Sequence, residues 1–332
     1  MQTYFNLFLY TKFIFIMVCN LLHCKHSKLD KIDIMINNIK YYIFSSFLYL
    51  LSLLPFRIVY IISYILYIFS YHIIRYRRSV VRSNLELAFP KKDITEIIKI
   101  EKDFYLYFCD MMLEIVKLFS ISKENMMKRM SFSGIDIINR ELESKNFVFV
   151  YLGHYYNWEW IASVPYWMKN NIYFGQIYHP LKNKTMDSIF INLRNSHGGH
   201  CITMKHTAKK MFELKAQNMK SVIGFISDQS PKKDSIHYWS TFFNQETAMF
   251  TGVEKIGKKF NAAIVYTDIK RVRRGYYHCQ FKEITNDISS YKDFEITDKY
   301  NSILENMINN NPQYWLWSHK RWKHKKPYVQ AN

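Results

Sequence analysis

An alternation of short apolar runs with helix-length segments begins after Gly134 and limits the possible folds more than any other feature of the sequence. The apolar runs predict strands over residues 147–152, 172–178, 201–204, 221–226, 262–268 and 276–283. The intervening segments predict helices over residues 157–168, 184–197, 207–217, 252–258 and 299–309. Such alternation is typical of a largely parallel sheet with helices on both faces. The sequence therefore predicts an α/β fold with a mixed, mostly parallel sheet flanked by helices.

A nearly uncharged apolar region precedes this part of the chain and predicts a membrane anchor. Residues 41–54 and 58–74 contain no charged side chain apart from the titratable His72, and Pro55-Phe56-Arg57 separates them. A membrane-spanning helix needs about 20 apolar residues. The region therefore fits one kinked, tilted span or a span followed by an interfacial helix, and a pair of buried core helices is the remaining alternative. Four arginines follow, which favours a cytoplasmic body lying against anionic lipid: Arg75, Arg77, Arg78 and Arg82.

The chain divides into four expected segments. Residues 1–34 form a leader of uncertain status, for which a signal-like or spanning segment and a true translation start at Met35 are both open. Residues 35–75 are the anchor, residues 76–327 the main domain and residues 328–332 a short tail. The main domain is expected to begin with a helix that ends before Pro90, followed by a long amphipathic helix capped by Asp93.

The net charge of the chain limits the classes of partner that it favours. Lysine and arginine number 46 against 27 aspartates and glutamates, which gives a formal net charge of +19. Such a charge favours nucleic acid, anionic lipid headgroups or an acidic carrier protein. No recognisable nucleic-acid-binding motif accompanies it, so no nucleic-acid partner is expected. The five cysteines match no zinc-binding spacing and are expected to be reduced thiols, and neither a metal nor a cofactor is expected.

Two polar pairs follow the ends of predicted strands. Gly153-His154 comes after the strand over residues 147–152, and Asp228-Gln229 comes after the strand over residues 221–226. In an open α/β sheet, ligands bind beyond the carboxyl ends of the strands. A neutral histidine there is a candidate general base, because its ordinary pKa lies near 6.5.

Glu159 is the nearest carboxylate in sequence that could orient the ring of His154. Residues five apart are separated by about 140° on an ideal helix, so these two side chains do not share a helical face. They can meet only if His154 lies in the turn after Gly153 and the helix begins between them. The bare spacing is common in unrelated proteins, and a capping histidine with a solvated glutamate is the alternative.

Further motifs stand in a specific order along residues 41–327. They are Tyr76-Arg77-Arg78 with Asn84-Leu85 and Phe89-Pro90; Gly153-His154 with Asn157-Trp158-Glu159; Tyr178-His-Pro-Leu-Lys-Asn183 with Arg194 and Gly198-Gly199; Ser227-Asp228-Gln229-Ser230; Phe242-Phe243 with Thr251-Gly252; and Gln313-Tyr314-Trp315-Leu316-Trp317 with His319, Arg321 and Lys323. By these motifs the sequence resembles the lipid A late acyltransferases, the lauroyl/myristoyl acyltransferase family within the lysophospholipid acyltransferase group. A leader such as residues 1–34 is not part of that family's pattern.

The resemblance implies a glycerol-phosphate-acyltransferase-like fold and a membrane-bound O-acyltransferase of the bacterial inner membrane, with its catalytic domain facing the cytoplasm. Such an enzyme transfers a fatty acyl chain from acyl carrier protein to a hydroxyl of a lipid A precursor. By the same match His154 is the general base, Glu159 is its orienting partner, and Arg194 binds a phosphate or the oxyanion. A surface arginine on its helix is the alternative for Arg194.

The remaining implied site residues are expected to bind substrate, each with a simpler structural alternative. Asn183 is a turn or ligand residue, Asp228 and Gln229 orient substrate or form a strand-end turn, and Thr251-Gly252 is a substrate contact or a helix N-cap. The aromatic and basic stretch 315–322 fits an interfacial patch or core packing. The motifs do not define the acceptor, so a lysophospholipid or an aminolipid stays open. A non-enzymatic basic membrane-surface or nucleic-acid binder is the alternative of a different class.

Overall fold

The computed structural model describes residues 28–168 and 171–326, with side chains described from residue 38 onward. The tail predicted over residues 328–332 and most of the predicted leader, including Cys19 and Cys24, lie outside the described residues. The first described helix, α2 (Lys28–Leu53), runs without a break through Met35, the boundary expected between leader and anchor.

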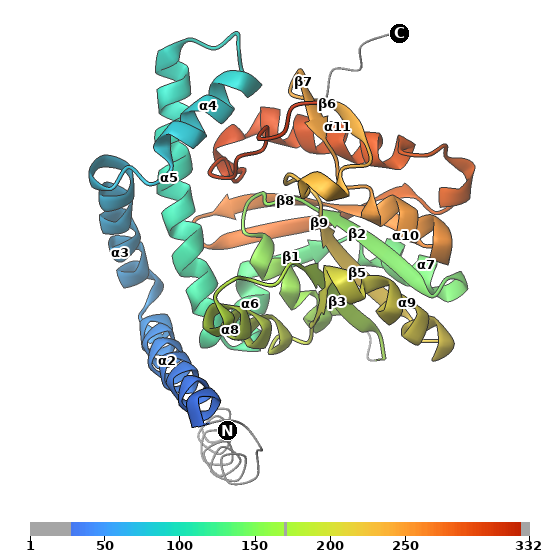
Figure 1. Cartoon of the computed structure of the whole chain (residues 1–332), viewed down its shortest axis with the longest axis horizontal. Coiled ribbons are helices and arrows are strands. Elements are labelled where there is room, and N and C mark those ends of the chain that lie inside the picture. The colour runs from blue at the N-terminus through green and yellow to red at the C-terminus, as the bar shows by residue number, and fades with distance from the viewer. Residues whose placement is uncertain (1–27, 169–170, 327–332) are drawn as a thin grey trace.

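A seven-stranded sheet forms the centre of the molecule (Figure 1). Its order is β1-β9-β8-β2-β5-β3-β4, and every neighbouring pair is parallel except β8 with β9. This confirms the prediction of a mixed, mostly parallel sheet flanked by helices. The strands are β1 (Met130–Ser133), β2 (Phe147–Leu152), β3 (Tyr173–Tyr178), β4 (His200–Thr203), β5 (Ser221–Ile226), β8 (Ala263–Arg273) and β9 (Tyr276–Thr285).

All six predicted strands are present, and β2 and β5 have the predicted bounds, whereas β8 extends five residues beyond its predicted end. Every residue of β2 is buried, because the strand has neighbours on both sides and cover on both faces, which favours a continuous apolar run. The expected helices also form, although residues 158–167 adopt 3₁₀ geometry, as η3 (Trp158–Trp167). The others are α8 (Lys184–Asn195), α9 (Thr207–Ala216), α10 (Gly252–Phe260) and α11 (Glu295–Asn310).

Several elements were not predicted from the sequence. They are short or lack a clear period, and include the edge strand β1, α6 (Lys123–Arg129), α7 (Ile135–Ser144) and the two-stranded hairpin of β6 (Trp239–Phe242) and β7 (Gln245–Ala248). The two helices expected before the sheet are present as α4 (Arg78–Ala88) and α5 (Ile94–Val116). Asp93 caps α5 through a complete capping box with Glu96, as its position indicated.

The N-terminal helices extend along one side of the molecule, next to the long helix α5 (Figure 1). Helix α3 (Phe56–Ile68) starts directly after Pro55, which ends α2 as predicted, and it continues into one π-helical turn, η1 (Phe69–Ile73). Residues 56–73 are long and apolar enough to cross a membrane, and only 17% of this window is buried. That exposure argues against the alternative of a buried core helix pair.

Helix α3 faces the protein with polar groups and faces outward with apolar ones. Ser63 donates a hydrogen bond to Asp110 at 2.6 Å, and Tyr60 donates one to Glu114 at 2.9 Å. The opposite side exposes large apolar residues, including Ile58, Ile61, Tyr64 and Ile65. A helix on the surface of a water-soluble protein turns its apolar side inward and its polar side outward. Helix α3 has the reverse arrangement, which suits a hydrocarbon environment.

Three of the four arginines that follow the apolar region have partners inside the protein. Arg78 and Arg82 both bind the buried carboxylate of Glu101, at 2.7 and 2.5 Å, and Arg77 donates to the carbonyl of Ser318. This cluster therefore joins α4 to α5 and to the C-terminal segment. Arg75 is exposed and carries a positive φ of 53° at the end of the apolar region.

Candidate active site

The two polar pairs predicted at strand ends meet because their strands are parallel neighbours. In the register of β2 with β5, Leu152 pairs with Ile226, and Ser227 N–H donates to the carbonyl of Leu152. His154 and Asp228 each lie two residues beyond this last pair. They therefore lie together at the carboxyl edge of the sheet, the edge at which a ligand site is expected.

Asp228 holds His154 through both of its carboxylate oxygens. Its Oδ1 lies 2.7 Å from Nδ1 of the His154 ring, and its Oδ2 accepts from the backbone N–H of His154 at 2.9 Å. The same Oδ2 accepts from the indole N–H of Trp315 at 2.7 Å. Burial raises the pKa of the Asp228 carboxyl, but His154 and these hydrogen bonds outweigh it and leave the pKa below its ordinary value. Asp228 is therefore an ionised acceptor.

The hydrogen bond with Asp228 defines which tautomer the His154 ring adopts. With the carboxylate on Nδ1, that nitrogen carries the proton of a neutral imidazole and Nε2 has the free lone pair. The side chain of Gln229 lies 3.3 Å from Nε2, and the Trp158 ring packs against the imidazole edge to face at 4.9 Å between centroids. The His154 side chain is 19% exposed, so Nε2 is a reachable base once the Gln229 amide moves aside.

Glu159 binds Arg194 instead of the ring of His154. Arg194 Nε donates to Glu159 Oε2 at 2.8 Å, Nη2 binds Oε1, and Trp158 donates its indole N–H to Oε1 at 3.2 Å. Among the described residues, no hydrogen bond joins Glu159 to His154, so the predicted contact between these two side chains is wrong. Burial raises the pKa of Glu159, but Arg194 outweighs it and the pKa is lowered. Arg194 is thus held by an internal ion pair rather than left free for substrate.

The backbone between His154 and Glu159 explains this orientation. A helix does begin between them, as the spacing argument required, but it is the 3₁₀ helix η3, which starts at Trp158. Tyr156 lies before it with a positive φ of 52°, a strained conformation for a tyrosine. Its N–H bonds to the carbonyl of Tyr314, and their rings stack at 4.2 Å. The turn thereby directs Glu159 toward α8, where Arg194 lies.

A buried carboxylate fixes the same turn to the helical side of the molecule. Glu114 of α5 accepts from Asn157 in the turn at 3.0 Å, from Tyr277 of β9 at 2.7 Å and from Tyr60 of α3 at 2.9 Å. Burial raises its pKa, and these donors oppose that effect only in part. The site turn and the apolar helix α3 are therefore held by one carboxylate.

The other predicted substrate residues have structural roles in this structure. Asn183 caps α8, with its side-chain oxygen accepting from the N–H of Met186 at 3.1 Å. Thr251 is the N-cap residue of α10 but makes no side-chain capping bond, and a Cβ at Gly252 would meet open space. The described hydrogen bonds do not connect either position with His154. The structure thus brings His154, Asp228 and Gln229 together, with Glu159 and Arg194 beside them.

The C-terminal segment contributes residues that the sequence did not assign to the site. Trp315 and Trp317 are 3% and 0% exposed, which agrees with core packing and excludes an interfacial role for these two side chains. Trp315 binds Asp228, and the N–H of Ser230 donates to Nε2 of His319 at 3.2 Å. In the sequence, only the dense aromatic motif pointed to these residues, and the motif does not reveal which strand end it packs against.

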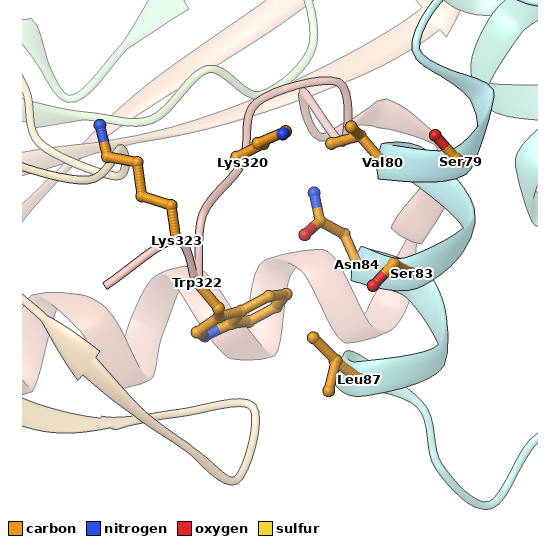
Figure 2. Close-up of a pocket in the computed structure, with 8 residues that line it drawn as sticks. All are labelled: Ser79, Val80, Ser83, Asn84, Leu87, Lys320, Trp322 and Lys323. Carbon is orange, nitrogen blue, oxygen red and sulfur yellow. The ribbon is translucent and has the colours of Figure 1, made fainter. Parts of the chain in front are cut away.

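A basic pocket lies between helix α4 and the C-terminal segment (Figure 2). Helix α4 supplies one wall, and the residues after His319 supply the other, where the Trp322 indole is held by Thr247 at 2.9 Å. Asn84 joins the two walls by donating to the carbonyls of Trp317 and His319, both at 2.7 Å. The cavity measures about 240 Å³ and is lined by Ser79, Val80, Ser83, Asn84, Leu87, Lys320, Trp322 and Lys323. Within the described residues neither lysine has an acidic partner.

The described residues contain no cluster of three or more histidine, cysteine or acidic side chains able to hold a metal ion. The described cysteines are free thiols, buried at Cys109 and Cys279 and partly buried at Cys201.

Residues 28–324 match the model of a protein family described as bacterial lipid A biosynthesis acyltransferase. The matched range covers nearly the whole chain and contains every residue of the site. No curated protein matched the chain.

Proposed function

Because the chain belongs to the bacterial lipid A biosynthesis acyltransferases, we propose that it transfers a fatty acyl chain from acyl carrier protein to a hydroxyl of a lipid A precursor, with His154 as the general base. The family makes the protein an acyltransferase acting on lipid A, and it sets aside the alternative of a non-enzymatic binder. The observation that carries the rest is the bond between Nδ1 of His154 and the ionised Asp228, at 2.7 Å.

The proposed reaction is a direct displacement at the thioester. The acceptor hydroxyl oxygen bonds to the thioester carbonyl carbon as its proton passes to Nε2 of His154. The carbon–sulfur bond then breaks, and the departing thiolate takes the proton from the imidazolium, so no acyl-enzyme is needed. Asp228 keeps Nδ1 protonated and stabilises the imidazolium, as the carboxylate of a serine-protease triad does. General-base assistance of this kind contributes about 10²–10⁴ in rate.

Gln229 has a proposed role in admitting the acceptor. Its amide nitrogen lies 3.3 Å from Nε2 of His154 and so occupies the position that the acceptor hydroxyl must take. We expect the amide to swing away and to bind the acceptor next to the reacting hydroxyl.

The Glu159–Arg194 pair is proposed to support the site through Trp158, without contacting substrate. It fixes the indole of Trp158, whose ring packs on His154. The two lysines of the basic pocket are proposed to bind an anionic group of the acceptor, because they lack acidic partners and belong to the same C-terminal segment as Trp315, which binds Asp228.

The protein is proposed to lie at the bacterial inner membrane, with its catalytic domain on the cytoplasmic side. The support is the exposed apolar side of α3 and η1, which together have the length and composition of a span over residues 56–73, and Arg75 shortly after them. An acidic acyl carrier protein and an anionic membrane surface both suit a chain with a net charge of +19.

The test is transfer of labelled acyl chain from acyl carrier protein to a lipid A precursor by the purified full chain in detergent. Lysophospholipid and aminolipid acceptors are run beside it. His154→Ala is expected to lower the rate by about 10²–10⁴, whereas His206→Ala, at an exposed histidine, is expected to leave it unchanged. Transfer by His154→Ala at the wild-type rate would exclude the general base. Transfer to a lysophospholipid or aminolipid alone would replace the proposed acceptor.

A further inference from the structure

The C-terminal segment Tyr314–Leu316 binds the turn that carries His154 through two backbone hydrogen bonds. The N–H of Leu316 donates to the carbonyl of His154 at 3.0 Å, and the N–H of Tyr156 donates to the carbonyl of Tyr314 at 3.0 Å. Tyr155 and Trp315 form an antiparallel bridge between these bonds. Residues about 160 positions apart in the chain thereby fix the backbone of the candidate base.

The side chain of Trp315 reaches from this segment to Asp228. Its indole N–H donates to Oδ2 at 2.7 Å, the same oxygen that accepts from the backbone N–H of His154. Two donors on Oδ2 leave Oδ1 for the imidazole. The indole is 3% exposed and packs edge to face on Trp317 at 4.6 Å and near Phe242 at 5.9 Å, so its direction is fixed by its surroundings.

We infer that Trp315 is a positioning residue, which fixes the Asp228 carboxylate so that Oδ1 faces Nδ1 of His154. The inference rests on the proposed function of His154 for its effect on acyl transfer, but not for its effect on the histidine ring itself. A hydrogen bond to a charged group contributes about 1.5–3 kcal/mol, which corresponds to about a 10- to 100-fold change in an equilibrium or rate. An aromatic side chain that only filled the core would have no such effect on the ring of His154.

Removing the indole N–H has a defined direction of effect. Oδ2 keeps the N–H of His154, which holds the carboxylate next to the ring, but with one donor fewer the carboxylate is less firmly oriented and attracts the ring proton more strongly. The imidazolium is then favoured, and His154 becomes protonated at a higher pH. The other titratable or charged groups within electrostatic reach of this pair stay unchanged: Glu159, Tyr300, His319 and Arg321.

The test compares Trp315→Phe with Trp317→Phe in the full-length protein. Both residues are buried tryptophans whose indole N–H donates one hydrogen bond, and Trp317 donates to the carbonyl of Pro312 at 2.6 Å. Two readouts are taken for each variant. The first is the pH profile of acyl transfer. The second is the pH dependence of diethyl pyrocarbonate labelling of His154, followed by peptide mass spectrometry, which reports ring protonation without any turnover.

We expect Trp315→Phe to raise the midpoint of His154 labelling, and the acid limb of the rate profile, by about 0.5–1 pH unit. At high pH it should still lower kcat about tenfold and leave KM for the acyl donor unchanged. Trp317→Phe should leave both midpoints at the wild-type values. An unchanged midpoint in Trp315→Phe, or an equal shift in both variants, would overturn the inference.

A second substitution covers the case in which Trp315→Phe does not fold. Benzothienylalanine introduced at position 315 alone keeps the bicyclic shape of tryptophan and replaces its N–H by sulfur. It should give the same upward shift, and an unshifted midpoint in this folded variant also overturns the inference. If the wild-type protein transfers no acyl chain while the labelling midpoint still shifts, the proposed function fails and the positioning role of Trp315 stands.

Discussion

Asp228 Oδ1 lies 2.7 Å from Nδ1 of His154, although the two residues are 74 positions apart in the chain. Parallel pairing of β2 with β5 brings them together, since each residue follows the last register pair, Leu152 with Ile226, by two positions. A neutral imidazole with a buried carboxylate on one nitrogen and a reachable lone pair on the other is suited to remove a proton from a hydroxyl. This relationship is the centre of the proposed mechanism.

The Glu159–Arg194 ion pair is expected to act mainly on stability. Arg194→Met leaves a buried carboxylate without its cation, which costs about 3–5 kcal/mol in the free energy of unfolding. The double variant Glu159→Leu with Arg194→Met should recover most of that loss, because apolar replacement of a whole buried pair is often close to neutral. Denaturant unfolding of the purified variants measures both. Equal stability of Arg194→Met and the wild type would contradict a structural role for the pair.

His154 and Asp228 were both predicted at strand ends, but the sequence paired His154 with Glu159, whereas in the structure the ring of His154 contacts Asp228. The bounds of β2 and β5 were predicted from their apolar runs, and both polar pairs were placed at strand ends. The order of strands within the sheet is not written in local periodicity, so the adjacency of β2 and β5 could not be predicted. Spacing along the chain therefore favoured the nearer Glu159. The left-handed turn at Tyr156 depends on Tyr314, a contact that no local pattern indicates.

The predicted anchor region was likewise only partly predictable from the sequence. The break at Pro55 and the apolar character of α3 follow directly from composition and from the lack of a proline N–H. The inward polar seam, in which Ser63 binds Asp110, needs the packing of α3 on α5 to become visible. The ion pairs of Arg78 and Arg82 could not be predicted either, because their partner, the buried Glu101, lies on a separate helix.

His319 is expected to make stability depend on pH. Burial lowers its pKa to about 4, and its Nε2 must be unprotonated to accept from Ser230. Between about pH 6.5 and 4 the unfolded chain binds a proton that the folded one does not, so the free energy of unfolding falls as pH falls through this window. His319→Gln keeps an acceptor without the titration, and its melting temperature should fall less between pH 7 and pH 5. The exposed control His206→Gln should follow the wild type, and an equally steep fall in His319→Gln would contradict the assignment.

The exposed side of α3 is expected to hold the protein on lipid. Ile61→Lys with Ile65→Lys places two charges on that side without touching the seam at Ser63, and should shift the protein from the floating to the soluble fraction in liposome flotation. Substitution of the exposed Val272 by lysine, on β8, should have no effect and serves as control. Flotation of the double variant at the wild-type level would refute the anchor.

The basic pocket is expected to contribute to acceptor binding. Reversing both of its unpaired charges, as Lys320→Glu with Lys323→Glu, should raise KM for the lipid A precursor about tenfold and leave kcat nearly unchanged, because the pocket does not touch His154. The matched pair Lys255→Glu with Lys259→Glu, on α10, makes the same change in net charge elsewhere. If both pairs change KM alike, the effect belongs to the overall charge and not to the pocket.

The most direct test of the account compares the two carboxylates by acyl transfer at neutral pH, with folding checked by thermal melting. Asp228→Asn removes the anion that stabilises the imidazolium and can reverse the tautomer of His154, and is expected to lower kcat by about 10³–10⁴. Glu159→Gln keeps oxygen and nitrogen atoms against Arg194 and is expected to lower kcat by less than about tenfold. A near-normal rate for Asp228→Asn together with a collapsed rate for Glu159→Gln would contradict the account and return the orienting role to Glu159.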